Sequence, residues 1–151
     1  MYQKALVPLD GSALAECALG HVQNLVKKGA VGDVTLLNVV KMDVAWAELY
    51  GKNFDLNGLR AALFSSAEKY LAKIGSRLDS EGLNVKTAMI ESNQPAQAIT
   101  HYARENGIGL IVIATHGYTG MKKLMMGSVA LNVLHDSNVP VLLIRPEACR
   151  E

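Results

Sequence analysis

Apolar residues in this chain alternate between short runs typical of β-strands and longer stretches with the three- to four-residue spacing of helices. Strands are predicted at residues 5–7, 34–40, 85–90, 110–114 and 139–144. Helices are predicted between them, beginning at Ser12, near Leu59, at Pro95 and near Val129. The 110–114 strand is apolar on both faces, which is typical of a buried central strand in a parallel sheet.

The predicted elements alternate from strand to helix and end with a strand. Such alternation predicts a parallel sheet with helices on both faces, and right-handed crossovers leave few topologies. Residues 41–57, which include Trp46 and Tyr50, have no clear period, so we predict a variable connection there, with a short helix as one option. A length of 151 residues predicts one domain over 1–151.

The composition excludes several classes of protein. Fifteen Lys and Arg against fourteen Asp and Glu leave a formal charge of +1, which is too balanced for a strongly basic nucleic-acid binder. No apolar run approaches the roughly 20 residues of a membrane span, and the first residues lack a signal-peptide pattern. Cys17 and Cys149 do not have the spacing of a disulfide scaffold, zinc finger or redox motif. We therefore expect a cytoplasmic protein with no nucleic-acid or membrane partner.

The residues just after each strand are the candidates for chemistry, because open α/β sheets bind ligands at the carboxyl ends of their strands. They are residues 8–12 after the first strand, 38–40 at the end of the second, and 115–120 with 127–128 after the fourth.

The loop after the fourth strand has the parts of a phosphate-binding cradle. Gly117 permits close backbone approach, and Gly127-Ser128 opens a helix whose free N–H groups and dipole favour an anion. Lys122 and Lys123 lie between these positions and add positive charge. A structural turn before an N-capped helix is the alternative interpretation.

Asp10 has two interpretations, which do not exclude each other. Its carboxylate can accept hydrogen bonds from a ribose hydroxyl or help to hold a metal, or it can cap the first helix together with Ser12, which is worth about 1 kcal/mol. His116 has no serine or cysteine nucleophile paired with it by pattern, so we expect it to bond to backbone. The other histidines, at 21, 101 and 135, are too scattered for a metal cluster.

Several segments together resemble the universal stress protein family. The family signature, Gly-x2-Gly-x9-Gly-(Ser/Thr), is similar to Ala114-Thr115-His116-Gly117, nine residues and Gly127-Ser128, with Ala114 in place of the first glycine. Segments 7–12, 36–39 and 138–144 resemble the first, second and last strands of that family. The resemblance implies an open, Rossmann-like parallel sheet of five strands in the order 3-2-1-4-5, with the ligand crevice between strands one and four.

The resemblance also implies which residues bind ATP. Asp10 would contact the ribose, and the backbone of Val39 would read the edge of the adenine. The phosphates would lie in a cradle formed by the loop and helix start, with Mg²⁺ bridging them rather than occupying a protein cage. The whole candidate set is Pro8, Asp10, Val39, Ala114, Thr115, His116, Gly117, Gly127, Ser128 and Val129, of which Gly117, Gly127, Ser128 and the Val129 backbone form the cradle.

The implied function is that of an ATP-binding regulatory protein of the stress response, not of a fast enzyme. No base that would activate water is evident and the Walker A spacing is absent, so slow ATP hydrolysis is the most that we expect. The sequence leaves open whether the nucleotide is ATP, AMP or cyclic AMP. Because Ala114 departs from the signature, the alternative is a dimeric stress protein that binds partners without a nucleotide.

Two further classes share this fold layout. A phosphoacceptor domain needs an aspartate after the third strand and a lysine after the last, where this chain has Glu91 and Arg145. An adenylating ligase needs a substrate pocket and a second domain, and neither is evident from the sequence. Both classes are therefore disfavoured.

The last strand predicts a homodimer. The resemblance places Val139 to Ile144 at an edge of the sheet, and this segment has no charged residue. Exposed apolar edges promote aggregation, so native proteins cover them, and Pro140 protects only the beginning of this one. We expect two copies to pair these edges across a two-fold axis.

Overall fold

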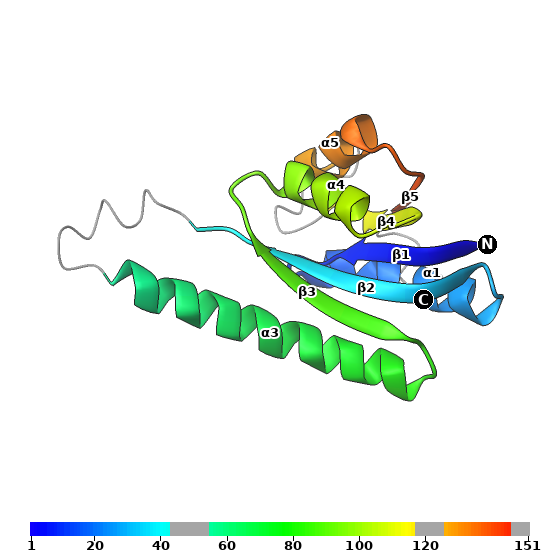
Figure 1. Cartoon of the computed structure of the whole chain (residues 1–151), viewed down its shortest axis with the longest axis horizontal. Helices are drawn as coiled ribbons and strands as arrows, with labels where there is room; N and C mark the ends of the chain where they lie inside the picture. Colours follow the sequence, from blue (N-terminus) through cyan, green and yellow to red (C-terminus); the bar gives the residue numbers. More distant parts are fainter. Residues whose placement is uncertain (43–54, 117–125, 146–151) are drawn as a thin grey trace.

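The computed structural model describes residues 1–42, 55–116 and 126–145. Its strands are β1 (Tyr2–Pro8), β2 (Val31–Val40), β3 (Val85–Glu91), β4 (Leu110–Ala114) and β5 (Val141–Ile144). Its helices are α1 (Ala13–Lys27), α3 (Leu56–Ser80), α4 (Pro95–Glu105) and α5 (Ser128–Asp136). Strands and helices alternate along the described chain, as the apolar pattern predicts (Figure 1).

The strands form one parallel five-stranded sheet in the order β3-β2-β1-β4-β5, which confirms the expected fold. Tyr2 pairs with Val31, so β1 and β2 both begin three residues before the apolar runs that predicted them. From β1 the chain moves outward to β3 on one side and, through β4, to β5 on the other. The carboxyl ends of β1 and β4 therefore flank the point where the strand order reverses.

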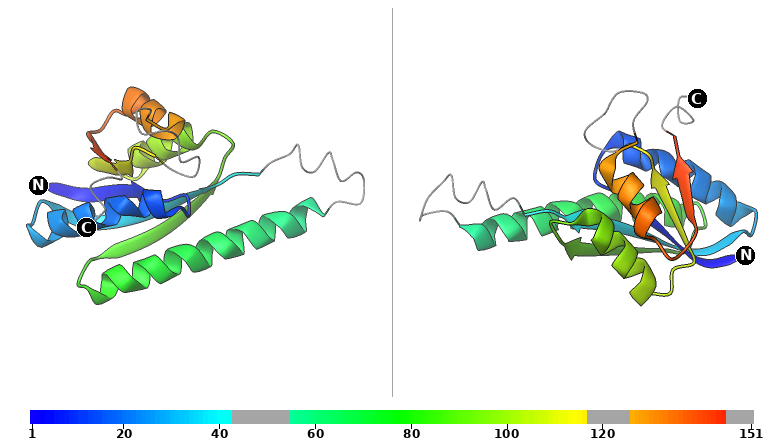
Figure 2. Two further views of the ribbon diagram at one scale, coloured as in Figure 1. Left: turned by 180° about the vertical axis from the view of Figure 1, so that it is seen from behind. Right: turned by 90° about the horizontal axis from the view of Figure 1, so that it is seen from above.

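Helices cover both faces of the sheet (Figure 2). On one face, α1 and α3 contribute buried residues such as Leu19 and Leu71 to a core shared with the strands. On the other, α4 and α5 contribute Ile99 and Val133, which pack in one cluster with Leu6 of β1. Successive residues of a strand point to opposite faces, so the central strands supply both cores. The two-faced arrangement confirms the prediction.

Polar side chains set the starts of two helices. Ser12 caps α1 as expected, because its hydroxyl accepts the backbone N–H three residues ahead at 3.1 Å. Gly29, with φ 70°, follows the end of α1 in a conformation that glycine adopts without steric cost. The start of α3 at Leu56 lies three residues before the predicted start near Leu59, because Asp55 caps the helix through a 2.9 Å hydrogen bond to a first-turn N–H.

The last strand is shorter than predicted. It begins at Val141 rather than Val139. The Ser137 hydroxyl accepts the N–H of Val139 at 3.1 Å and donates to its carbonyl at 2.7 Å, which holds that backbone in a turn. Pro140 then has no N–H to give to the sheet, so regular pairing starts one residue later.

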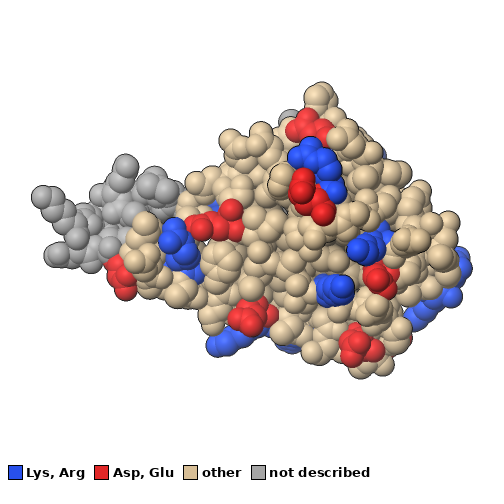
Figure 3. Space-filling view, viewed as in Figure 1, with Lys and Arg blue, Asp and Glu red and all other residues tan. Residues whose placement is uncertain are grey.

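Membrane-spanning potential, surface charge and the optional short helix bear on the remaining predictions. No helix in the described part of the chain is both long and apolar enough to cross a membrane. On the face shown in Figure 3, Lys and Arg side chains lie among Asp and Glu side chains and form no continuous basic track. The optional short helix around Trp46 and Tyr50 falls in 43–54, outside the described residues.

Candidate functional site

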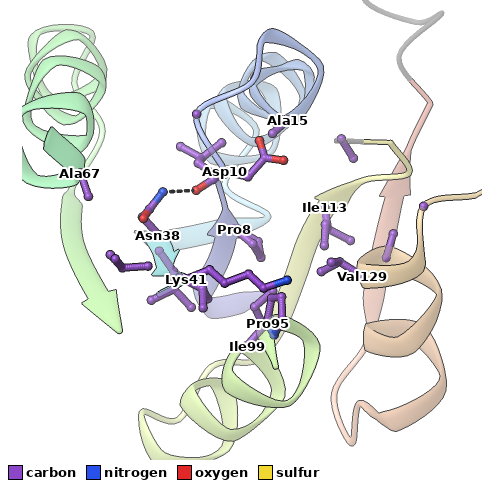
Figure 4. Close-up of a pocket in the computed structure, with 18 of the residues that line it drawn as sticks. Pro8, Asp10, Ala15, Asn38, Lys41, Ala67, Pro95, Ile99, Ile113 and Val129 are labelled. Atoms are coloured by element: carbon purple, nitrogen blue, oxygen red, sulfur yellow. Dashed lines mark hydrogen bonds between the residues drawn. The ribbon is translucent and has the colours of Figure 1, made fainter. Parts of the chain in front are cut away.

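A cavity of about 700 Å³ lies at the carboxyl end of the sheet. Residues at the ends of β1, β2 and β4 line it, together with residues of α1, α3, α4 and α5 (Figure 4). The volume is in the range of small-molecule and cofactor sites. The cavity lies where the strand order reverses, which is the place that parallel α/β sheets use for ligands.

The turn after β1 is held from the neighbouring strand β2. The N–H of Leu9 donates to the carbonyl of Leu37 at 2.8 Å. The side-chain amide of Asn38 then donates to the carbonyl of Leu9, also at 2.8 Å (Figure 4). Gly11, with φ 91°, turns the chain into α1 directly afterwards. These contacts fix the backbone on both sides of Asp10, which lines the cavity.

Asp10 organises the start of α1 without capping it directly. Its Oδ1 accepts the backbone N–H of Ser12 at 2.9 Å and the Ser12 hydroxyl at 2.6 Å. Ser12 in turn accepts a helical N–H, so the cap belongs to Ser12 and the carboxylate orients it. Asp10 therefore contributes to the cap of α1 only through Ser12, and not by a direct contact with a helical N–H. Its side chain is exposed and lines the cavity, which a ribose contact requires.

Thr115 connects three elements at the end of β4. Its N–H donates to the carbonyl of Ile144 in β5 at 2.9 Å, and its own carbonyl accepts the N–H of Gly127 at 2.7 Å. Its buried hydroxyl is 2.8 Å from Nδ1 of His116. We expected His116 to bond to backbone, but the hydrogen-bond partner of its ring is the Thr115 hydroxyl. The other ring nitrogen, Nε2, is buried and has no hydrogen-bond partner in the described part of the chain.

Gly127 is needed for space rather than for an unusual backbone conformation. Its φ of −59° is available to any residue. A Cβ atom at this position would lie 3.1 Å from the Thr115 carbonyl oxygen, which is tighter than ordinary packing. Gly127 is also the N-cap of α5 and offers no side-chain cap, so the first N–H groups of the helix are not satisfied by a capping side chain. The structural turn before an N-capped helix is thus present, with a glycine N-cap that leaves the first helical N–H groups open to an anion as well.

The structure gathers the candidate residues around this one cavity. Its lining includes Pro8, Asp10, Val39, Ala114, Thr115, His116, Gly127, Ser128 and Val129. Ala114, which stands where the family signature has glycine, is 6% exposed and leaves the cavity open. Gly117, Lys122 and Lys123 lie in 117–125, outside the described residues.

Sequence reasoning missed one whole wall of the cavity. Leu63, Ser66, Ala67 and Tyr70 line it from α3, and Pro95 and Ile99 line it from α4. The apolar spacing of these helices shows which face is buried, but not that part of the face borders a cavity. Lys41 was also missed, although it stands directly after the second predicted strand, where a search of strand ends could have found it.

Metal-ligating residues are sparse at this site. No group of three or more His, Cys, Asp or Glu side chains capable of holding a metal occurs among the described residues. Among the described residues that line the cavity, Asp10 is the only carboxylate. A divalent ion would therefore need to take most of its ligands from a bound molecule and from water.

The comparison with protein families decides the classification. The model of the universal stress protein family matches residues 1–145 of the chain. The chain belongs to the universal stress protein family. The fold and the strand order described above agree with this assignment.

Individual universal stress proteins are similar over almost the whole chain. The protein MJ0577 from Methanocaldococcus jannaschii is 31% identical, over 96% of each chain. Its solved structure superposes with a TM-score of 0.82 at 32% identity, again over 96% of each chain. UspA from Lactobacillus plantarum is 25% identical, with a TM-score of 0.77, over 95% of this chain and 98% of that one.

More distant universal stress proteins share the fold and were solved with nucleotides. One, in complex with cAMP, is 19% identical with a TM-score of 0.64, over 96% of this chain and 98% of that one. Another, from Arabidopsis thaliana with AMP bound, is 14% identical with a TM-score of 0.66, over 95% of this chain and 91% of that one. At these identities the likeness establishes the fold alone.

Proposed function

We propose that this chain is a regulatory protein of the stress response that acts in the cytoplasm by binding ATP. The observation that carries the proposal is the cavity at the point where the strand order reverses. Asp10 lines one part of it, and the start of α5, which has no side-chain cap, lines another. A carboxylate suits ribose hydroxyls, and an uncapped helix start suits phosphates. The cAMP and AMP complexes of distant family members support an adenine nucleotide as the ligand.

The proposed pose follows the lining of the cavity. The adenine lies near the end of β2, where the backbone of Val39 is available to its edge, and Asp10 accepts from the ribose. The phosphates lie against Gly127, Ser128 and the backbone of Val129. Gly117 is proposed as a further part of the cradle and lies outside the described residues.

Mg²⁺ fits this arrangement as an ion that bridges phosphates. It prefers oxygen ligands and commonly keeps several waters while contacting one or two carboxylates. Asp10 offers a carboxylate on the cavity wall, and the described residues contain no protein cage that would bind the ion alone. The proposal is one of binding, and it assigns no catalytic residue.

A thermal melt tests the proposal directly. Protein freed of nucleotide is heated with and without millimolar Mg-ATP. At a hundred times Kd, ligand binding adds about 2.7 kcal/mol of stability. This corresponds to a rise in Tm of roughly 5–10 °C for a chain of this size. AMP, cyclic AMP and GTP, measured in parallel, identify the preferred nucleotide. An unchanged Tm with every nucleotide would favour the partner-binding alternative instead.

Asp10→Asn tests the ribose contact. Asparagine keeps an oxygen that can accept from Ser12, so the start of α1 is preserved, but it removes the carboxylate charge. With both ligands titrated without Mg²⁺, so that the carboxylate makes no metal contact, we expect ATP to bind about tenfold more weakly, the effect of losing a hydrogen bond to a charged group, while inorganic triphosphate binds as before. Calorimetric titration measures both ligands. Equal losses for the two would show that Asp10 does not read the ribose.

Ser12→Ala is the matched control for this variant. It removes the cap hydroxyl and is expected to lower the free energy of unfolding by about 1 kcal/mol. The backbone N–H at this position still holds Asp10 Oδ1, and Ser12 is not among the described residues that line the cavity, so the ratio of ATP to triphosphate affinity is expected to stay unchanged.

A further inference from the structure

Lys41 is the only Lys or Arg among the described residues that line the cavity. It directly follows β2 and stands two positions after Val39. Figure 4 shows its side chain extending from the end of β2 across the cavity, toward Pro95 and Ile99 of α4. Lys41 follows β2, which lies on one side of β1, whereas the signature loop follows β4, which lies on the other side.

Lys41 has no ionic or hydrogen-bonded partner in the described part of the chain. The one acidic side chain of the described lining, Asp10, uses its Oδ1 to hold Ser12. The Lys41 ammonium places a positive charge in the part of the cavity that it lines. That part of the cavity therefore suits an anionic group of a ligand better than a neutral one.

The shape of the side chain suits a contact across the cavity. The methylene stem of a lysine can lie on apolar surface while its ammonium stays in water. Pro8 and Ile99, which also line the cavity, supply such a surface. The ammonium is thus directed away from its own strand, toward the space that a ligand would fill.

The chemistry of the group selects a phosphate as its partner. An ammonium only donates hydrogen bonds, so it needs an acceptor. Phosphate oxygens carry formal charge and form charge-assisted hydrogen bonds, which are about twice as strong as neutral ones. The acceptors of an adenine ring are neutral. A lysine that reaches across the cavity is therefore better matched to the phosphates than to the base.

We propose that Lys41 pairs with the phosphates of the bound nucleotide, and that this pairing makes affinity rise with the phosphate charge. The inference rests on the proposed function of the cavity. It adds a residue from the second strand to the phosphate contacts, which the signature loop and the start of α5 otherwise supply.

Titration of three ligands into the parent protein and two variants tests the inference. Adenosine, AMP and Mg-ATP are titrated into the parent protein, Lys41→Met and Lys41→Arg. Lys41→Met is expected to weaken ATP about tenfold and to leave adenosine unchanged. Lys41→Arg keeps the charge and is expected to stay close to the parent. Raising the salt concentration is expected to weaken ATP less in Lys41→Met than in the parent.

Lys86→Met provides the control for removing a lysine charge. Lys86 is exposed on β3 and is not among the described residues that line the cavity. It is expected to bind all three ligands like the parent. The Tm of ligand-free Lys41→Met is expected to equal that of the parent, because Lys41 is exposed and unpaired among the described residues.

The possible results separate this inference from the function on which it rests. A parent that binds none of the ligands contradicts the proposed function and the inference together. A parent that binds ATP while Lys41→Met binds it equally well overturns the role of Lys41 alone. Equal weakening of adenosine and ATP would place Lys41 at the base and would also overturn the phosphate pairing.

Discussion

Gly127→Val is expected to abolish detectable ATP binding while the protein remains folded. The backbone at Gly127 has φ −59° and ψ 149°, which valine adopts readily, so the effect comes from space alone. The new Cβ would stand 3.1 Å from the Thr115 carbonyl oxygen and 3.8 Å from Cα of His116. To relieve this contact the start of α5 must move away from β4, and the 2.7 Å bond between Gly127 and Thr115 must lengthen.

The size of the effect follows from the contacts that would be lost. Two hydrogen bonds from the helix start to a charged phosphate, at about 1.5–3 kcal/mol each, correspond to a loss of affinity of roughly a hundredfold or more. Overpacking of this kind costs about 1–3 kcal/mol of stability, which a protein with a typical 5–15 kcal/mol can lose without unfolding. Calorimetry measures the binding, and a thermal melt followed by circular dichroism measures the fold.

Two control variants make this result specific. Gly127→Ala adds only the Cβ atom and is expected to bind ATP with an intermediate affinity. Gly20→Val places the same side chain on α1, where a Cβ would meet no atom within 4 Å. It is expected to bind like the parent. If Gly127→Val and Gly20→Val bind equally well, the start of α5 is not part of the phosphate site.

Local pattern was sufficient to predict the order and type of the described elements. β4 is five consecutive buried apolar residues, and the sequence alone marks it as a central parallel strand. The strand ends were less predictable. β1 extends back to Tyr2 through exposed residues, because hydrogen bonding to β2 does not depend on whether a side chain is apolar. The late start of β5 depends on the Ser137 hydroxyl, which a hydrophobic pattern does not register.

The candidate site was predictable where it is built from strand ends and not where it is built from helix faces. Thr115 directly follows β4 and Asp10 stands two residues after β1, so their place at the carboxyl edge follows from the topology. Tyr70 and Ser66 reach the same cavity from the middle of α3, and that depends on how the helix packs across the sheet. The partner of His116 was equally unpredictable, because a side-chain contact between neighbours depends on rotamers.

The edge strand on which the expected homodimer would form is β5. β5 is the last strand of the sheet and pairs with β4 on one side, so its other edge has no strand partner among the described residues. Val141 and Leu143 pack toward the core with α4 and α5, whereas Leu142 is 36% exposed. We propose that β5 pairs with β5 of a second copy in antiparallel fashion, as an apolar edge strand without charge requires protection.

Leu142→Lys is expected to convert the dimer to a monomer at micromolar concentration. In an antiparallel pair across a two-fold axis, residues near the centre of the strand face their own copies, so two lysines would oppose each other. Such like-charge pairs at an interface cost several kcal/mol, and the dimer Kd is expected to rise roughly a hundredfold. Leu142 is a better position than Val141 or Leu143, because charges at those half-buried positions would also disturb the core. Analytical ultracentrifugation gives the oligomeric state.

Charge pairing then distinguishes the β5 edge from the other exposed apolar surface. Leu142→Glu alone is expected to be monomeric, and an equimolar mixture with Leu142→Lys is expected to form dimers, because the opposite charges now face each other. Leu131→Lys, at a 50% exposed position on α5, is expected to remain dimeric. A parent protein that sediments as a monomer would refute the dimer. Loss of the dimer in Leu131→Lys but not in Leu142→Lys would place the interface on α5, since the edge of β5 would then be free.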